Sequence, residues 1–196
     1  MTQLIIVVFD GLQPAQINEY YAPNIHRFGA EGCFFENHHP VFPSVTRVNA
    51  ATMVTGTNPS QHGLFGNTFV ASDFDSRRVL NAMEPELSEI ASSGHRVLLT
   101  RTIQEILLEH GKEYMAVGVG TSGNAYVHNP VGETVGGATI HPDFSIPHGL
   151  HGHIKGIYGD WPMEKLPNSP RFRHAMNVFT DYILGECNPD VALIWS

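Results

Sequence analysis

The chain has 196 residues, of which 42% are hydrophobic and 15% charged, which suits one globular domain with a real core and excludes a disordered or fibrous chain. The formal net charge of −8 argues against general binding to nucleic-acid backbones, because such binding needs a basic face. The charge leaves a small phosphate ester open as a substrate, since a bound metal ion can supply positive charge locally.

The cysteines and the first residues bear on the compartment. Cys33 and Cys187 lie far apart and outside any CxxC pattern, so we expect two buried, reduced thiols. The apolar run over residues 4–9 is too short to span a membrane, and no basic segment of a signal peptide precedes it. We therefore expect a protein without a membrane partner that is cytoplasmic, or periplasmic or secreted if an upstream segment is missing.

The run over residues 4–9 is the first predicted element. It is rich in β-branched residues and is typical of a central parallel strand that is covered on both faces. Asp10 follows it directly, at the carboxyl end of the strand, where open α/β sheets gather their ligands. A carboxylate there could bind a metal ion, although an Asp-Gly pair taken alone is more often a turn.

A helix is expected to begin near Pro23, because proline suits the first helical turn, and to end at Gly32. Ile25 and Phe28 would share its buried face. A short strand over residues 33–35 should follow.

Five further elements have clear sequence signals. A helix over 49–55 is closed by Gly56, and a helix over 102–110 has Thr102 and Glu105 in the positions of a capping box. The remaining elements are a strand over 114–119, an amphipathic helix over 168–184 and a strand over 191–195.

The alternation of strands and helices predicts an α/β fold with a mostly parallel central sheet flanked by helices. The segment over residues 120–170 is rich in Gly, Pro and His and has little periodicity, so we expect a long excursion over the site or a partly mobile loop. The chain stops at Ser196, directly after the last strand, which suggests truncation at the C-terminus.

Thr46 is the strongest candidate for a catalytic residue. The loop before Thr46 contains two prolines, Pro40 and Pro43. Thr46 itself lies near the start of a helix, where free backbone N–H groups favour the binding of an anion such as phosphate. A hydroxyl is a poor nucleophile until it is activated, and coordination to a metal is one way to activate it. By local sequence alone, a helix cap is the better interpretation of Thr46.

A set of motifs over residues 4–67 resembles the nucleotide pyrophosphatase/phosphodiesterase family of the alkaline phosphatase superfamily. The resemblance rests on the order and spacing of all the pieces together, and beyond Asn67 only the general layout agrees. The pieces are Asp10-Gly11 with Pro14, Ala22-Pro23-Asn24-Ile25 with Gly32, Pro43-x-x-Thr46-x-x-Asn49, and Thr55-Gly56-x-x-Pro59-x-x-His62-Gly63-x-x-Gly66-Asn67.

The resemblance implies that residues 1–196 are the N-terminal part of a single alkaline-phosphatase-like catalytic domain. Asp10 would be a metal ligand, and Thr46 both a metal ligand and the nucleophile, which forms a covalent threonyl-phosphate. Asn67 would bind the substrate and stabilise its phosphoryl oxygen in the transition state. The implied reaction is hydrolysis of a phosphodiester or pyrophosphate bond in a small molecule such as a nucleotide.

Two departures from the family pattern matter. The family has an aromatic residue and a proline after the nucleophile, where this chain has Arg47 and Val48. Arg47 could bind a phosphate or carboxylate of the substrate, or be a solvated side chain on the first helical turn. The family's other Asp and His ligands lie beyond Ser196, so we expect only part of one site for the two divalent metal ions, zinc by resemblance, and an inactive fragment.

A rival metal site is suggested by four histidines, His141, His148, His151 and His153. Their spacing fits no common ligand pattern, so we expect a solvated or substrate-facing loop.

Phosphonoacetate-type phosphonate hydrolysis remains an alternative reaction. A non-catalytic, ligand-binding remnant of the fold is the alternative from another class. A sulfatase is disfavoured because no proline stands where its modified nucleophile requires one, and a mutase because its nucleophile is serine.

Overall fold

Five strands form the central sheet, in the order β1-β7-β4-β5-β6, in the computed structural model, which describes residues 3–196. Strands β1, β7, β4 and β5 are parallel and only β6 runs antiparallel, so the predicted mostly parallel α/β fold is confirmed. The strands are β1 (Leu4–Val8), β4 (Tyr114–Gly118), β5 (Ala138–Ile140), β6 (Ser145–Ile146) and β7 (Val191–Trp195), and a separate antiparallel pair joins β2 (Thr68–Phe69) to β3 (Leu80–Asn81).

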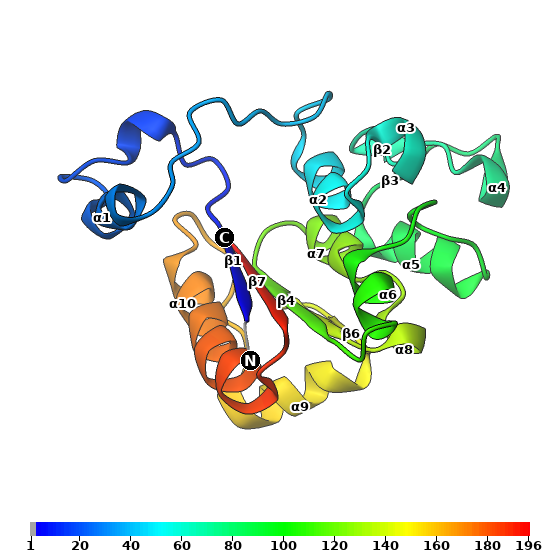
Figure 1. Cartoon of the computed structure of the whole chain (residues 1–196). Coiled ribbons are helices and arrows are strands. Elements are labelled where there is room, and N and C mark those ends of the chain that lie inside the picture. The colour runs from blue at the N-terminus through cyan, green and yellow to red at the C-terminus, as the bar shows by residue number, and fades with distance from the viewer. Residues whose placement is uncertain (1–2) are drawn as a thin grey trace.

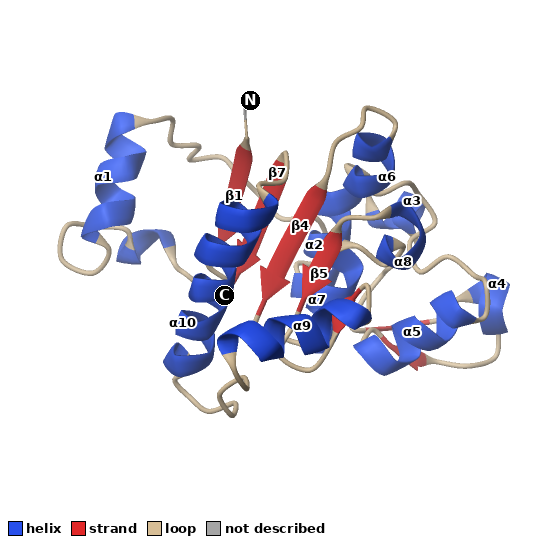
Figure 2. Cartoon of the chain, turned by 90° about the horizontal axis from the view of Figure 1, so that it is seen from below, coloured by secondary structure: helices blue, strands red, loops and turns tan. Residues whose placement is uncertain are grey.

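Helices cover both faces of this sheet (Figures 1 and 2). One face carries α2 (Thr46–Thr55), α5 (Glu84–Ser92), α6 (Ile103–Leu108) and α7 (Ser122–His128). The other carries α9 (Gly149–Tyr158) and α10 (Ser169–Asn177), which continues into the π-helical η2 (Val178–Cys187). The shorter elements are η1 (Pro14–Gln16), α1 (Pro23–Glu31), α3 (Pro59–His62), α4 (Ser72–Asp75) and α8 (Gly132–Val135).

Two hydrophobic cores result from the alternation of side chains along the central strands. Tyr114 and Ala116 of β4 pack on the α2 side, whereas Met115 and Val117 pack against α9 and α10. All five residues of β4 and all five of β7 are buried, so both predicted strands are confirmed. The long helix predicted over 168–184 is also confirmed, with Phe179 and Ile183 in the second core.

The predicted position of β1 is wrong, because it lies at the edge of the sheet and pairs only with β7. Leu4 is 52% exposed and Val7 49%, so this strand is not covered on both faces. Helix α1 forms where it was predicted but buries no residue, and Phe28 is 78% exposed. An apolar run gives no information on how many neighbours its strand has.

Three other predictions fail, two of them at residues 33–35 and one over residues 120–170. Residues 33–35 form no strand, and Cys33 is exposed rather than buried, although both cysteines are free. The segment over residues 120–170 is not a loop, since it contains α7, α8, β5, β6 and α9. Its elements are short, between two and ten residues, which hides their periodicity.

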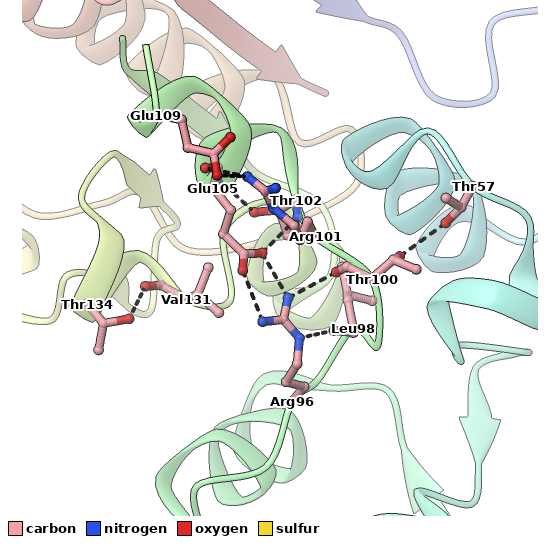
Figure 3. A network of polar contacts seen from close by, with 10 residues as sticks. All are labelled: Thr57, Arg96, Leu98, Thr100, Arg101, Thr102, Glu105, Glu109, Val131 and Thr134. Carbon is pink, nitrogen blue, oxygen red and sulfur yellow. Dashed lines mark hydrogen bonds and ion pairs between the residues drawn. The ribbon is translucent and has the colours of Figure 1, made fainter. Parts of the chain in front are cut away.

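The capping box predicted at the start of α6 is confirmed (Figure 3). The Thr102 hydroxyl accepts from the backbone N–H of Glu105, and the Glu105 carboxylate accepts from the backbone N–H of Thr102. The helix itself is shorter than the predicted range of 102–110 and ends at Leu108.

Within residues 3–196, no helix has the length and hydrophobicity needed to cross a membrane.

Candidate active site

The candidate site lies at the carboxyl ends of β1 and β7, facing the start of α2. The backbone N–H of Ser196 donates to the carbonyl of Val8 at 3.0 Å, so the two strands end side by side. In Figure 1 the C-terminus lies beside the point where the chain leaves β1. This is the edge at which open α/β sheets bind their ligands.

Helix α2 begins at Thr46, three residues earlier than its predicted start. Its N-cap residue is Val45, whose side chain cannot accept a hydrogen bond from the first turn. The first N–H groups of a helix lack acceptors within the helix, so those of Thr46, Arg47 and Val48 are open to an anion. Asn49 fixes the preceding loop, since its side chain accepts from the Val41 N–H and donates to the Val45 carbonyl.

The predicted nucleophile and the predicted metal ligand are in contact. The Thr46 hydroxyl Oγ1 donates to Oδ2 of Asp10 at 3.1 Å, across 36 residues of sequence. The same carboxylate oxygen accepts from the indole Nε1 of Trp195 at 3.4 Å. Trp195 is buried on the α2 side of the sheet, so it holds Asp10 from a rigid element.

The loop that carries Asn67 is built around a buried histidine. His62 is fully buried, with Nε2 3.1 Å from the Thr52 hydroxyl and Nδ1 accepting from the Leu64 N–H. Burial lowers the pKa of His62, so the ring stays neutral. Gly63 then turns the chain with φ of +82°, where a Cβ would also collide with Leu99. Asn67 itself is exposed at the end of this loop.

One cavity of about 450 Å³ brings the predicted site residues together. Its lining includes Asp10, Thr46, Arg47 and Asn67, all four of the residues that the sequence singled out. Thr121 and Asn124, from the start of α7, close another side.

Arg47 turns away from Asp10 and toward α7. Its Nε donates to the Thr121 hydroxyl at 3.3 Å, and no carboxylate within residues 3–196 forms an ion pair with it. Partial burial without a counter-charge lowers the pKa of Arg47, although an arginine stays charged at any physiological pH. The guanidinium is therefore available to an anion in the cavity.

The residues present fit part of a metal site. Asp10 and Thr46 offer a carboxylate and a hydroxyl oxygen close to each other, which are donors that divalent cations accept. In the part of the chain that the structure describes, however, no three His, Cys, Asp or Glu side chains gather around one point. These two oxygens could contribute to a coordination shell but do not complete one.

The four histidines of the rival site do not converge. His141 is buried, with Nε2 3.1 Å from the Gly120 carbonyl, and His148 contacts Glu133. His151 contacts the Pro142 carbonyl, and the ring of His153 packs against Tyr182. The expectation of a loop is wrong as well, since His151 and His153 lie in α9.

Sequence reasoning missed Trp195, Thr121 and Asn124. Trp195 was interpreted only as the end of a buried strand. Thr121 and Asn124 lie in the segment that lacked periodicity, yet Thr121 follows a predicted strand and has the residue type of a helix cap. That combination places Thr121 at the carboxyl edge of the sheet and could have identified it.

A comparison with known proteins finds a match between residues 4–193 and the family described as type I phosphodiesterase / nucleotide pyrophosphatase. Bis(5'-adenosyl)-triphosphatase ENPP4 from Pongo abelii is 33% identical over 66 residues, which are 34% of this chain and 15% of that protein.

Two solved structures share the fold. The phosphonoacetate hydrolase from Sinorhizobium meliloti 1021, in complex with phosphonoacetate, matches 99% of this chain and 46% of its own, with a TM-score of 0.70 at 18% identity. Murine ectonucleotide pyrophosphatase / phosphodiesterase 5, an inactive threonine-to-alanine variant in complex with AMP, matches 100% and 43%, with a TM-score of 0.61 at 13% identity. This chain thus spans less than half the length of either structure.

The family match covers residues 4–193, which is nearly the whole chain, and three residues of the motifs noted in the sequence, Asp10, Thr46 and Asn67, line one cavity. The chain belongs to the type I phosphodiesterase / nucleotide pyrophosphatase family of hydrolases.

Proposed function

We propose that this chain carries the nucleophile of a hydrolase that cleaves phosphodiester or pyrophosphate bonds, with Thr46 forming a covalent threonyl-phosphate. The observation that carries the proposal is the hydrogen bond of 3.1 Å from the Thr46 hydroxyl to Asp10 inside the shared cavity. The hydroxyl proton already faces a base, which favours attack by its oxygen.

The first step forms a bond between Thr46 Oγ1 and phosphorus and breaks the bond to the leaving oxygen. Asp10 accepts the hydroxyl proton, and the leaving oxygen takes up a proton from solvent. The open N–H groups of the first turn of α2 and the amide of Asn67 stabilise the charge on the phosphoryl oxygens. In the second step a water oxygen bonds to phosphorus as the bond from phosphorus to Thr46 Oγ1 breaks. Asp10 returns its proton to Thr46 Oγ1, and the water releases one proton to solvent.

Two divalent metal ions, zinc by family resemblance, belong to this proposal. When bound, they would lower the pKa of the attacking oxygen and neutralise charge on the leaving one. Asp10 and Thr46 would be their ligands from this chain, and the other ligands would come from outside it.

The substrate class includes nucleotides, since one relative is a bis(5'-adenosyl)-triphosphatase and one structural neighbour binds AMP. A phosphonate hydrolase is the second candidate. It is favoured by Arg47, which stands where the family has an aromatic residue, and by the fold neighbour that binds phosphonoacetate.

The test is turnover of bis-p-nitrophenyl phosphate with added zinc, in this chain and in any longer protein that contains it. Thr46→Ala should abolish zinc-dependent turnover, whereas Thr180→Ala, which removes an exposed hydroxyl on η2, should keep it. Turnover of phosphonoacetate alone would keep the mechanism and change the substrate. The 196-residue chain alone is expected to be inactive, because Asp10 and Thr46 supply only part of the metal site. A longer, folded, zinc-loaded protein that contains this chain and hydrolyses neither compound would contradict the proposal and would be a binding domain.

A further inference from the structure

The two consecutive side chains at the start of α2 diverge. Thr46 points to Asp10 at the end of β1, and Arg47 points to Thr121 at the start of α7. Helices α2 and α7 pack against each other on the same face of the sheet (Figure 1). The cavity therefore has two chemically different ends, a nucleophile end beside β1 and a cationic end beside α7.

Thr121 joins the groups of the cationic end. Its hydroxyl oxygen accepts from Arg47 Nε at 3.3 Å and from the backbone N–H of Asn124 at 3.4 Å. This shared oxygen fixes the guanidinium next to the first turn of α7. The two terminal nitrogens of Arg47 have no hydrogen-bond partner in residues 3–196, so a planar, bidentate donor is left over.

Asn124 adds an unsatisfied amide to the same wall. The residue is 1% exposed and lines the cavity, and its Oδ1 has no partner among the described residues. A buried amide group without a hydrogen bond costs about 1–3 kcal/mol, so a polar group bound in the cavity would be stabilised by pairing with it. Rotation of the amide about χ2 exchanges its ends, and it can then donate to an acceptor in the cavity.

We propose that Arg47 and Asn124 form a subsite for a second oxyanion of the substrate, separate from the phosphoryl group that Thr46 attacks. The inference rests on the proposed function, because it assumes that the phosphorus atom lies at the Thr46 end. The guanidinium and the amide together present donors to a carboxylate or phosphate, and an uncharged aromatic substituent would leave both unpaired. The preferred substrates are small compounds with two anionic groups.

The test measures binding rather than turnover. The side-chain N–H signals of Arg47 and Asn124 are followed by NMR, with and without zinc, during titration with phosphonoacetate and with methylphosphonate. These probes share the phosphonate and differ by one carboxylate. We expect both signals to shift selectively with phosphonoacetate, and phosphonoacetate to bind more tightly.

Variants separate this subsite from general charge attraction. Arg47→Gln should raise the Kd for phosphonoacetate by about tenfold or more, because a charge-assisted hydrogen bond is lost. The Kd for methylphosphonate should change by less than about twofold. Arg47→Lys should restore part of the preference for phosphonoacetate over methylphosphonate. Asn124→Asp should abolish this preference, because the new carboxylate repels the carboxylate of the ligand. Arg173→Gln removes an exposed cation in the neighbouring cavity and should change the affinity for neither ligand.

The subsite proposal is overturned if the wild type binds the two ligands equally, or if Arg47→Gln loses the same affinity for both. Hydrolysis is scored separately with bis-p-nitrophenyl phosphate. A longer protein containing this chain that binds phosphonoacetate selectively but hydrolyses nothing would contradict the proposed function and support the subsite. A protein that hydrolyses the diester through Thr46 but does not prefer phosphonoacetate over methylphosphonate would support the proposed function and contradict the subsite.

Discussion

At the scale of single residues, Trp195 contacts both the hydrophobic core and the candidate active site. Its ring packs in the core while its Nε1 donates to the carboxylate oxygen that also accepts from Thr46. The indole thus adds to the Thr46 hydroxyl a second restraint on the side chain of Asp10, which lies at the exposed end of β1. Trp195 is a positioning residue, because it acts on the reaction through Asp10.

We predict that Trp195→Phe lowers kcat about threefold to tenfold and leaves KM nearly unchanged, because it removes one neutral hydrogen bond and keeps the ring in place. The measurement is steady-state diester hydrolysis over a range of substrate concentrations. Trp161→Phe, which alters a tryptophan stacked on His174, is the control and should have wild-type kcat. A rise in KM with constant kcat would instead indicate a role in substrate binding.

The sequence predicted those site residues that belong to a spaced motif and missed those that only the fold assembles. Asp10, Thr46, Arg47 and Asn67 lie within 58 positions of one another and meet in the cavity. Asn124 reaches the same cavity from α7, and nothing in its own neighbourhood indicates that its amide lacks a partner. Such a property exists only once distant helices pack together.

At the scale of elements, the start of α6 shows how one carboxylate can stabilise a helix and a loop together (Figure 3). Glu105 closes the capping box with Thr102 and also accepts two hydrogen bonds from Arg96, at 2.9 and 2.8 Å. Arg96 in turn donates to the carbonyls of Leu98 and Thr100. The loop between α5 and α6 is thereby tied to the first turn of α6.

We predict that Glu105→Gln lowers the free energy of unfolding by about 1 kcal/mol at pH 7, a modest value because the Arg96 side chain is 42% exposed. Burial alone would raise the pKa of Glu105, but the bonds from Arg96 and Thr102 hold it below its ordinary value. The stabilisation is complete above the unfolded-state pKa of about 4.3 and is lost as the pH falls through the lower folded-state pKa.

Urea denaturation at pH 7 and at acid pH measures this effect. The difference between wild type and Glu105→Gln should shrink as the pH falls through the folded-state pKa. Glu109→Gln provides the matched control, since it breaks an ion pair with Arg101 in which both side chains are more than half exposed. It should cost less than about 0.5 kcal/mol. Equal losses for the two variants would refute the special role of Glu105.

The sequence predicted elements well where periodicity is long and poorly where they are short. Strands β4 and β7 and the helix that begins at Ser169 follow from apolar runs and helical spacing. The two-residue strand β6 and the four-residue helix α8 are too short to show a period. Tertiary packing, rather than local propensity, holds those pieces in place.

At the scale of the whole molecule, β4 and β7 are buried in the sheet, whereas β1 is exposed at its edge. This strand pairs with β7 on one side only, and Leu4, Ile5 and Val7 remain between 46% and 52% exposed. Exposed apolar edge strands pair readily with other strands. The sequence could not show this, since the same run suits a central strand that has two neighbours.

We predict that the 196-residue chain associates with itself through this edge and that Ile5→Lys reduces the association, because a charged side chain on an edge strand opposes strand pairing. Sedimentation velocity at several concentrations measures it, and Ile106→Lys, at a residue 44% exposed on α6, is the control for added charge on an apolar surface. If the wild type is monomeric at all concentrations, the edge is sufficiently protected as it stands. If both variants reduce association equally, general hydrophobicity rather than the edge of β1 drives it. Selective loss in Ile5→Lys would identify β1 as the strand at which this sheet accepts a further strand, next to the carboxylate that faces Thr46.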